Sequence, residues 1–236
     1  MSDLVLVEMH GNRGELVLNR PDRRNALIGP LVDQLHEGLK QCVSDPDCHA
    51  IVIRGAQGYF CAGLDLKEFS ADPAPEWRAR FADDWAEFHC AVFDCPKPVL
   101  GALEGFAIAG GSALAFACDF LVVGKRSFLH VAEAERGMHA PVNIAWLVLR
   151  FEYAKAMRFA QLAERFYGDE LVQQGVALES IEDDQVLSRT REIADRLAGF
   201  DLNAIIRIKT AIRAARGVSD FRQLIETVRD VPGLVP

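Results

Sequence analysis

Two short glycine-containing turns are the features of this 236-residue chain that are most suited to chemistry. The first, Ala109-Gly110-Gly111, lies between residues 98–104 and 111–118, which predict a strand and a small-residue helix. The first turn of a helix has N–H groups without intrahelical partners, and glycine lets another group approach closely. We therefore predict an oxyanion site at Gly110 and Gly111. The alternative is that the two glycines only make a tight turn between strand and helix.

The second turn, Cys61-Ala62-Gly63, follows a strand predicted for residues 50–54. The next backbone N–H group belongs to Leu64. Two such donors, one from each turn, could stabilise the oxygen of a thioester enolate if they face one cavity. Cys61 could also be reactive, but we interpret it as a small apolar filler.

The two turns lie in stretches that resemble the enoyl-CoA hydratase/isomerase (crotonase) family. Its N-terminal signature resembles residues 18–27, LNRPDRRNAL. Its first oxyanion segment resembles residues 58–66, GYFCAGLDL, and its second resembles residues 97–119, KPVLGALEGFAIAGGSALAFACD. A downstream helical signature matches residues 152–176. Because these motifs follow the family's order over residues 4–228, the chain is identified as a member.

This resemblance implies an α/β fold, namely a crotonase-like spiral of ββα repeats with a C-terminal helical region. We assign residues 1–180 to the spiral core that binds acyl-CoA. Residues 181–236 would form a shortened helical region for trimerisation and pocket closure. The family's last helical segment has no counterpart after Thr227, so we expect a different pocket closure. By analogy we also expect a homotrimer or a dimer of trimers.

The resemblance also implies the residues that hold the substrate. The oxyanion hole would consist of the N–H groups of Leu64 and Gly110. The other substrate-binding positions are expected at Arg24, Ala26, Ala62, Gly63, Asp65, Leu66 and Gly111. Within this set, we expect Asp65 to fix its turn through hydrogen bonds. Coenzyme A is part of the substrate, and no separate cofactor or metal is expected.

Three arginines near the N-terminal signature supply positive charge. Arg20, Arg23 and Arg24 could meet the phosphates of the nucleotide. The alternative for at least one of them is ion pairing or solubility at the surface.

The acid/base residues decide which reaction the family member would catalyse. Family hydratases hold a water between two glutamates. The first of these positions is Ala113 here, whereas the second falls on Glu133. A single carboxylate beside an oxyanion hole suits proton removal from C2 or C4 of the acyl chain. Family Δ3,Δ2-enoyl-CoA isomerases use one glutamate in this way, at the position that matches Glu133.

The neighbours of Glu133 bear on its role. Val131, Ala132 and Ala134 should raise its pKa by desolvation, which suits a base that works near neutral pH. The alternative is a surface ion pair, because Glu135 and Arg136 are adjacent.

Three functions remain open at this level. The leading hypothesis is double-bond isomerisation with Glu133 as the base. A second is hydration, with the water activated in another way by His130, His139 or Glu135. The third is an acyl-CoA binding protein without catalysis, which the alanine at position 113 and the short C-terminal region suggest.

Composition excludes several other classes. The net charge of −8 argues against nucleic acid or an anionic membrane as the main partner. No apolar run reaches the roughly 20 residues that span a bilayer, and no N-terminal signal segment is recognisable. We therefore expect a cytoplasmic protein. The six cysteines show neither a C-x-x-C pair nor zinc-site spacing, so we expect free, mostly buried thiols.

The remaining pattern predicts the elements that position the site. Strands are predicted at 4–8 and 15–19, and a loop over the site at 68–76. Helices are predicted at 31–42, 77–93, 142–150, 153–163, 169–174, 183–198 and 202–215. The helix at 77–93 carries an aromatic stripe of Trp77, Phe81, Trp85 and Phe88. Such a stripe is usually core, and here it could also wall an acyl pocket.

Overall fold

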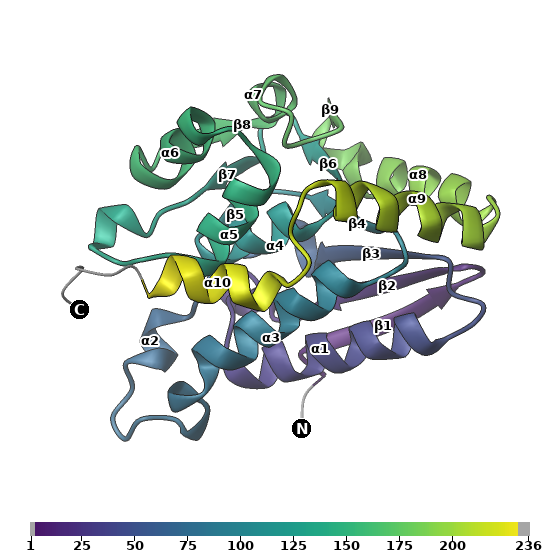
Figure 1. Cartoon of the computed structure of the whole chain (residues 1–236). Coiled ribbons are helices and arrows are strands. Elements are labelled where there is room, and N and C mark those ends of the chain that lie inside the picture. The colour runs from purple at the N-terminus through teal and green to yellow at the C-terminus, as the bar shows by residue number, and fades with distance from the viewer. Residues whose placement is uncertain (1–2, 231–236) are drawn as a thin grey trace.

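The computed structural model describes residues 3–230, which form two sheets connected and covered by helices (Figure 1). The larger sheet has the strand order β1-β2-β3-β4-β6-β9. Its strands are β1 (Val5–His10), β2 (Arg13–Leu18), β3 (Ala50–Gly55), β4 (Val99–Leu103), β6 (Phe120–Gly124) and β9 (Glu179–Ile181). The hairpin β1-β2 is antiparallel, and all other neighbours in this sheet are parallel.

Both faces of the central strands β2, β3 and β4 are buried, as is usual for parallel strands. On β3, Ile51 and Ile53 belong to the main core, which includes residues of α1 (Gly29–Ser44) and α3 (Phe81–Asp94). Ala50 and Val52 point the other way and pack with residues of α8 (Val186–Ala198). Figure 1 shows α1 and α3 on one side of the sheet and α8 on the other. This double burial explains the uninterrupted apolar run at residues 50–53.

The smaller sheet consists of three-residue strands. It contains β5 (Phe106–Ile108), β7 (Phe128–His130) and β8 (Arg165–Tyr167), in that order. The sequence predicted none of these strands, nor β6 or β9. A three-residue strand is too short to display a period of two, and its pairing depends on distant segments.

The other helices mostly follow the prediction, with ends shifted by a few residues. They are α2 (Leu66–Phe69), α4 (Gly110–Ala117), α5 (Pro141–Arg150), α6 (Tyr153–Gln161), α7 (Gly168–Gln173), α9 (Leu202–Ala215) and α10 (Phe221–Arg229). Short 3-10 turns lie at Pro21–Arg23, Ala56–Gly58, Glu76–Ala79, Ala134–Arg136 and Asp183–Gln185. Two predictions need correction, because α2 extends to Phe69, into the loop expected at 68–76, and α10 was not predicted. In the described part of the chain, no helix is long and apolar enough to span a membrane.

The C-terminal helix α10 lies across α3 and α5. Its Phe221 ring stacks on Phe93 of α3, with 5.0 Å between centroids, and lies 4.3 Å from Trp146 of α5. Phe221 and Ile225 are buried there. The predicted helical region 181–236 therefore contributes α10 to the main core, while its last residues, 231–236, lie outside the described part.

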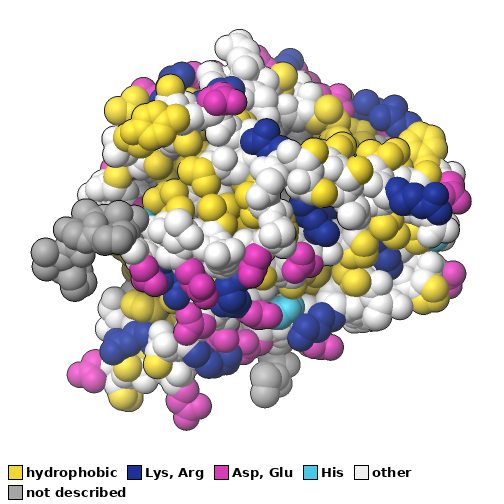
Figure 2. Space-filling view, in the orientation of Figure 1, with side chains coloured by type: hydrophobic (Ala, Val, Ile, Leu, Met, Phe, Trp, Pro, Cys, Tyr) yellow, Lys and Arg dark blue, Asp and Glu magenta, His cyan; other side chains and the backbone are white. Residues whose placement is uncertain are grey.

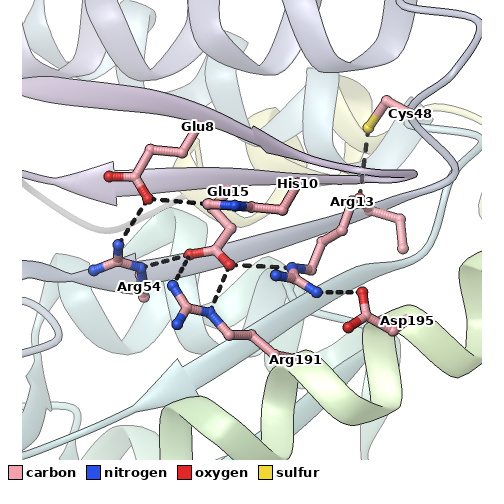
Figure 3. A network of polar contacts seen from close by, with 9 residues as sticks. Glu8, His10, Arg13, Glu15, Cys48, Arg54, Arg191 and Asp195 are labelled. Carbon is pink, nitrogen blue, oxygen red and sulfur yellow. Dashed lines mark hydrogen bonds and ion pairs between the residues drawn. The ribbon is translucent and has the colours of Figure 1, made fainter.

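A buried ion network fastens α8 to the N-terminal hairpin (Figure 3). Glu15 of β2 is fully buried and accepts hydrogen bonds from Arg13, Arg54 and Arg191, the last of which belongs to α8. Glu8, His10 and Glu15 bring potential metal ligands within 4.8 Å of one another. Because arginines occupy both oxygens of Glu15, we assign this cluster to structure rather than to metal binding.

Candidate active site

The structure brings the two predicted glycine turns together. Cys61 pairs with β5: its N–H donates to Phe106 O at 3.0 Å, and its carbonyl accepts from Ile108 N at 3.0 Å. A Cβ atom on Gly63 would lie 3.4 Å from the amide nitrogen of Gly110. The smaller sheet, which the sequence did not predict, therefore carries the second turn to the first.

Two backbone N–H groups remain free at this junction. Among the residues that the structure describes, neither Leu64 N–H nor Gly110 N–H has an acceptor. Gly110 begins α4, so its N–H lies at the positive end of that helix. Both residues are only half-buried. Leu64 and Gly110, the two donors that the sequence predicted, therefore both keep an unpaired N–H near this junction, and their binding of one oxygen atom stays a prediction.

The residue before Gly110 has an unusual backbone. Ala109 has φ 50° and ψ −116°, a conformation that favours glycine and costs about 1–3 kcal/mol for other residues. It is held by a hydrogen bond from Ala109 N to His130 O at 2.9 Å. Ser112 Oγ also donates to His130 O at 2.8 Å. Strain at this turn is therefore balanced by contacts to β7.

Glu133 follows β7 and lies beside the same turn. Its Oε1 accepts a hydrogen bond from Asn143 Nδ2 at 2.9 Å. The same Asn143 nitrogen donates to Ala109 O at 3.1 Å. The other oxygen, Oε2, is buried and has no partner among the described residues. One carboxylate oxygen is thus fixed, and the other is free to exchange a proton.

Burial raises the pKa of Glu133, although hydrogen bonds from backbone N–H groups and from Asn143 oppose the shift. Val131 and Ala132 are buried as predicted, whereas Ala134 is exposed. No ion pair to Glu133 is found within residues 3–230, so the alternative of a surface ion pair is wrong. The direction of the pKa shift agrees with the predicted cause.

The other acid/base candidates lie around Glu133. His130 is buried, and its Nε2 lies 3.7 Å from Glu135 Oε1, beyond hydrogen-bond distance. His139 is exposed and lines the same cavity as Glu133. Neither histidine is hydrogen-bonded to Glu133 in the structure. Among these candidates, Glu133 is the residue that shares a hydrogen-bond donor, Asn143, with the Ala109-Gly110-Gly111 turn.

An apolar cavity of about 400 Å³ reaches Glu133. It lies between the 3-10 turn at Ala134–Arg136 and helices α5 and α6. Its lining includes Met138, Ile144, Leu147, Tyr153 and Met157. None of its lining residues comes from the aromatic stripe, for which the sequence offers walling an acyl pocket as a second role, or from the loop predicted at 68–76.

The aromatic stripe is mainly core. Trp77, Phe81, Trp85 and Phe88 are all at least nine-tenths buried. Trp85 also lies beside the Ala109-Gly110-Gly111 turn. A Cβ atom on Gly110 would lie 3.8 Å from Trp85 Cζ2 and 2.9 Å from Leu27 Cδ1. Trp85 can therefore bound the space in front of Gly110.

The predicted substrate-binding segments run side by side. Ala62 N donates to Arg24 O at 3.2 Å, Leu27 N to Gly63 O at 2.7 Å, and Asp65 N to Leu27 O at 2.9 Å. Ala26 is buried, Ala62 is half-buried, and Arg24 and Leu66 are exposed. Gly111 is packed so closely that a Cβ atom would lie 2.4 Å from Cys61 O. Their contact with coenzyme A remains a prediction.

Asp65 and Arg20 form a buried ion pair. Arg20 Nη1 lies 2.8 Å from Asp65 Oδ2, and its Nη2 lies 3.4 Å from Glu68 Oε1. Asp65 also caps α2 by accepting from Glu68 N at 3.2 Å. Arg20 is therefore engaged with carboxylates, which confirms for this arginine the ion-pairing alternative and not the contact with phosphates. Arg23 and Arg24 are exposed and remain candidates.

The cysteines behave as buried thiols. All six are free, and only Cys90 is less than fully buried. Burial raises the pKa of Cys61 to about 12, so its thiol stays protonated at neutral pH. This supports the interpretation of Cys61 as a filler.

Sequence reasoning missed one functional candidate, Asn143. It is a buried polar residue on α5, at 2% exposure. The only available signal was an asparagine on the apolar face of the helix predicted for residues 142–150. A single polar residue in such a helix says nothing about what it contacts.

Comparisons with known proteins show which family the chain resembles. A family model described as enoyl-CoA hydratase/isomerase matches residues 10–228. The chain is 31% identical over 216 residues to a probable enoyl-CoA hydratase of Mycobacterium tuberculosis (strain CDC 1551 / Oshkosh), which covers 90% of this chain and 82% of the relative. It is 27% identical over 219 residues to 1,2-epoxyphenylacetyl-CoA isomerase of Escherichia coli (strain K12), with 91% and 84% covered.

A solved structure shows the same fold. The crystal structure of an enoyl-CoA hydratase from Polaromonas sp. JS666 matches with a TM-score of 0.84 and 27% identity, covering 96% of this chain and 89% of that one. The predicted crotonase-like α/β fold with a C-terminal helical region is thereby confirmed.

Proposed function

The chain belongs to the enoyl-CoA hydratase/isomerase family, and on this premise we propose that it moves a double bond in an enoyl-CoA thioester by proton transfer. One observation carries the proposal. A single carboxylate, Glu133, has one buried oxygen without a partner among the described residues, next to the turn that presents Gly110 N–H. The second carboxylate that family hydratases use is replaced by the buried Ala113.

The proposed reaction uses two backbone donors and one base. The thioester oxygen accepts hydrogen bonds from Leu64 N–H and Gly110 N–H. Glu133 Oε2 removes a proton from C2 of a 3-enoyl thioester, and the electron pair of that C–H bond delocalises onto the oxygen. Return of the proton to C4 moves the double bond from C3–C4 to C2–C3. Atoms and charge balance without a further reactant.

The raised pKa of Glu133 supports this role. A base whose pKa is closer to neutral accepts a proton from carbon more readily than an ordinary carboxylate does. The apolar cavity beside Glu133 suits a hydrocarbon acyl chain, which is consistent with the acyl-CoA substrates of the family.

Hydration is the second candidate, and one observation favours it. Glu133 Oε2 and Asn143 Oδ1 are both buried acceptors without donors among residues 3–230. A bound water could donate to such atoms. The relatives named above include a protein named as a hydratase and one named as an isomerase.

The test is an exchange experiment in D2O with short 3-enoyl-CoA and 2-enoyl-CoA, followed by mass analysis of the products. Double-bond migration, or deuterium at C2 or C4, is expected from the unmodified protein. In the Glu133→Gln variant, the rate of migration or exchange should be about 10²–10⁴-fold lower. The matched control is Glu152→Gln, which makes the same substitution at an exposed glutamate. This variant should retain the rate of the unmodified protein.

Other outcomes of the experiment decide between the alternatives. A product heavier by one water would favour hydration and defeat the isomerase proposal. Binding of acyl-CoA without exchange or turnover would favour a protein that binds acyl-CoA without catalysis.

We also propose that the chain forms a homotrimer or a dimer of trimers through α9. No residue of α9 is fully buried, and Ile208 and Ile212 are 56% and 63% exposed. Figure 2 shows hydrophobic side chains gathered over the region of α8 and α9. Exposed apolar surface of this kind is usually covered by a partner. Sedimentation equilibrium of the protein and of Ile208→Asp with Ile212→Asp tests this; a monomeric unmodified protein would contradict it.

The six free thiols support a cytoplasmic location, because a reducing compartment keeps such thiols unpaired. Cell fractionation tests this proposal. Detection of the protein in an oxidising compartment would contradict it.

A further inference from the structure

Asn143 connects the two halves of the site through one nitrogen atom. It is 2% exposed and lies in the first turn of α5. Its Nδ2 donates to Glu133 Oε1 at 2.9 Å and to Ala109 O at 3.1 Å. One acceptor belongs to the proposed base. The other belongs to the turn that carries the oxyanion donor.

The contact to Ala109 reaches the oxyanion hole directly. Ala109 C=O and Gly110 N–H belong to the same peptide unit, which is planar. A hydrogen bond that fixes the carbonyl therefore fixes the direction of the N–H on the opposite side of the plane. Donation to the carbonyl also polarises the peptide and strengthens its N–H as a donor. Since Ala109 has a strained backbone, this orientation needs such support.

The contact to Glu133 selects one oxygen for chemistry. A glutamate has several rotatable bonds, and a free carboxylate could present either oxygen to the substrate. With Oε1 held by Asn143, only Oε2 remains without a partner among the described residues. A donor to the charged form also limits how far burial can raise the pKa.

We propose that Asn143 is a positioning residue that sets the Glu133 carboxylate and the Gly110 N–H in one fixed relation. The proposal rests on the proposed function, in which Glu133 is the base and Gly110 an oxyanion donor. It applies equally to isomerisation and hydration, because both need an acid/base carboxylate at a fixed place relative to the thioester oxygen.

The helix that carries Asn143 is itself held on two sides. Trp146, one turn further along α5, donates from Nε1 to His89 Nδ1 of α3 at 2.8 Å. The ring of Phe221 from α10 lies 4.3 Å from that of Trp146. Asn143 therefore stands on a fixed support rather than on a loop, which a positioning role requires.

The other charged groups around Glu133 are few. Arg136 on the following 3-10 turn favours its charged form. Glu135 and His130 approach each other at 3.7 Å, and His139 lines the shared cavity. All of them remain unchanged in the variants below, so a change in Glu133 titration reports on Asn143.

Two substitutions separate positioning from folding. Asn143→Leu keeps a similar volume but removes the donor, and Asn143→Asp keeps the shape but replaces the donor with a second carboxylate. Thr190→Val on α8 is the matched control. It also removes a buried hydrogen bond, from Oγ1 to Val186 O at 2.8 Å, but it lies in the separate core on the other face of the sheet.

The first readout is the titration of Glu133 itself. Protein labelled with ¹³C at the glutamate carboxyl carbons is followed by NMR, and the Glu133 signal is assigned by its loss in Glu133→Gln. The titration midpoint should rise in Asn143→Leu, because a donor to the carboxylate is lost. It should rise further in Asn143→Asp, because of the like charge. Thr190→Val should leave it unchanged.

The second readout is the pH dependence of turnover. In both Asn143 variants kcat should fall about 10–100-fold while KM changes little, and the acid limb of kcat/KM should move to higher pH. A fall in kcat with an unshifted limb and an unshifted midpoint would indicate a merely structural role and would overturn the proposal.

The two readouts also separate this proposal from the proposed function. Absence of turnover in the unmodified protein defeats the proposed function, yet the NMR titration still decides whether Asn143 governs Glu133. Normal turnover with an unchanged midpoint in both variants defeats the positioning role alone.

Discussion

Two buried carboxylates of this protein have opposite environments. Glu15 accepts from Arg191 at 2.7 and 2.8 Å, from Arg54 at 2.8 Å and from Arg13 at 3.1 Å. Burial alone would raise its pKa, but the hydrogen bonds and charges of Arg191 and Arg54 outweigh that effect and lower the pKa to about 2. Glu133 has a single side-chain donor, the neutral amide of Asn143, and burial wins, so its pKa is raised.

The comparison shows that burial does not decide what a carboxylate does. The number and charge of its donors decide it. Glu15 has no free oxygen, and its charge is fully used to hold β2, β3 and α8 together. Glu133 keeps one oxygen without a partner among the described residues. The saturated carboxylate serves stability, whereas the unsaturated one is available for chemistry.

The largest expected difference between the two sites is in stability. Glu15→Gln removes the negative charge from among three arginines and should lower the free energy of unfolding by about 3–5 kcal/mol. Glu133→Gln should leave it unchanged or raise it, because a carboxylate that is costly to bury is neutralised. Urea unfolding followed by circular dichroism measures both. Equal losses in the two variants would contradict the comparison.

A fall in pH should change the contributions of the two carboxylates to the free energy of unfolding in opposite directions. The folded-state pKa of Glu15 is about 2, below its ordinary 4.5, so its contribution is complete above pH 4.5 and is lost as pH falls toward 2. That loss amounts to about 3 kcal/mol. Glu133 has a raised pKa, so its effect on stability is most favourable below pH 4.5 and declines as pH rises through the folded pKa.

Unfolding free energies between pH 2 and pH 7 test this sign. The unfolding free energy of Glu15→Gln should depend less on pH in the acid range than that of the unmodified protein. The unfolding free energy of Glu133→Gln should no longer decline as pH rises toward neutral.

The rate of proton exchange should rise with pH through the folded pKa of Glu133, which lies above the ordinary value for glutamate. An acid limb at or below pH 4.5 would speak against a desolvated base.

The smallest effect concerns the backbone beside Glu133. Ala109→Gly relieves a positive φ of 50° but adds freedom to the unfolded chain, so a net stabilisation of up to about 1 kcal/mol is expected. Ala154→Gly, at an exposed helical position in α6, should instead destabilise by about 1 kcal/mol. If both substitutions destabilise equally in urea unfolding, Ala109 carries no strain.

Much of the local structure of the candidate site could be predicted from sequence. Glycines, a strand pattern and a small-residue helix indicated both glycine turns, because turn chemistry is a short-range property. Glu133 was found through its registration with a family motif. Its desolvation was anticipated from Val131 and Ala132, although the exposed Ala134 does not contribute in that way.

The contacts that join these parts could not be predicted. The strands β5, β7 and β8 exist through pairing with distant segments, and three residues give no periodic signal. Asn143 acquires its role only because α5 packs beside Ala109 and Glu133. Arg20 looked available for phosphate, but the fold buries it against Asp65. In each case the missing information is long-range.

The candidate oxyanion site is built almost entirely from main-chain atoms. Backbone hydrogen bonds connect three segments, residues 24–27, 61–65 and 106–108, and they include the isolated bridges Leu27–Leu64 and Cys61–Ala107. Such a main-chain network tolerates substitution of outward-facing side chains, provided that the close-packed glycines remain. Because both candidate donors are backbone N–H groups, a change of a neighbouring acid/base side chain does not remove them. For enzyme design, this separates the frame that would hold the anion from the side chains that would move protons.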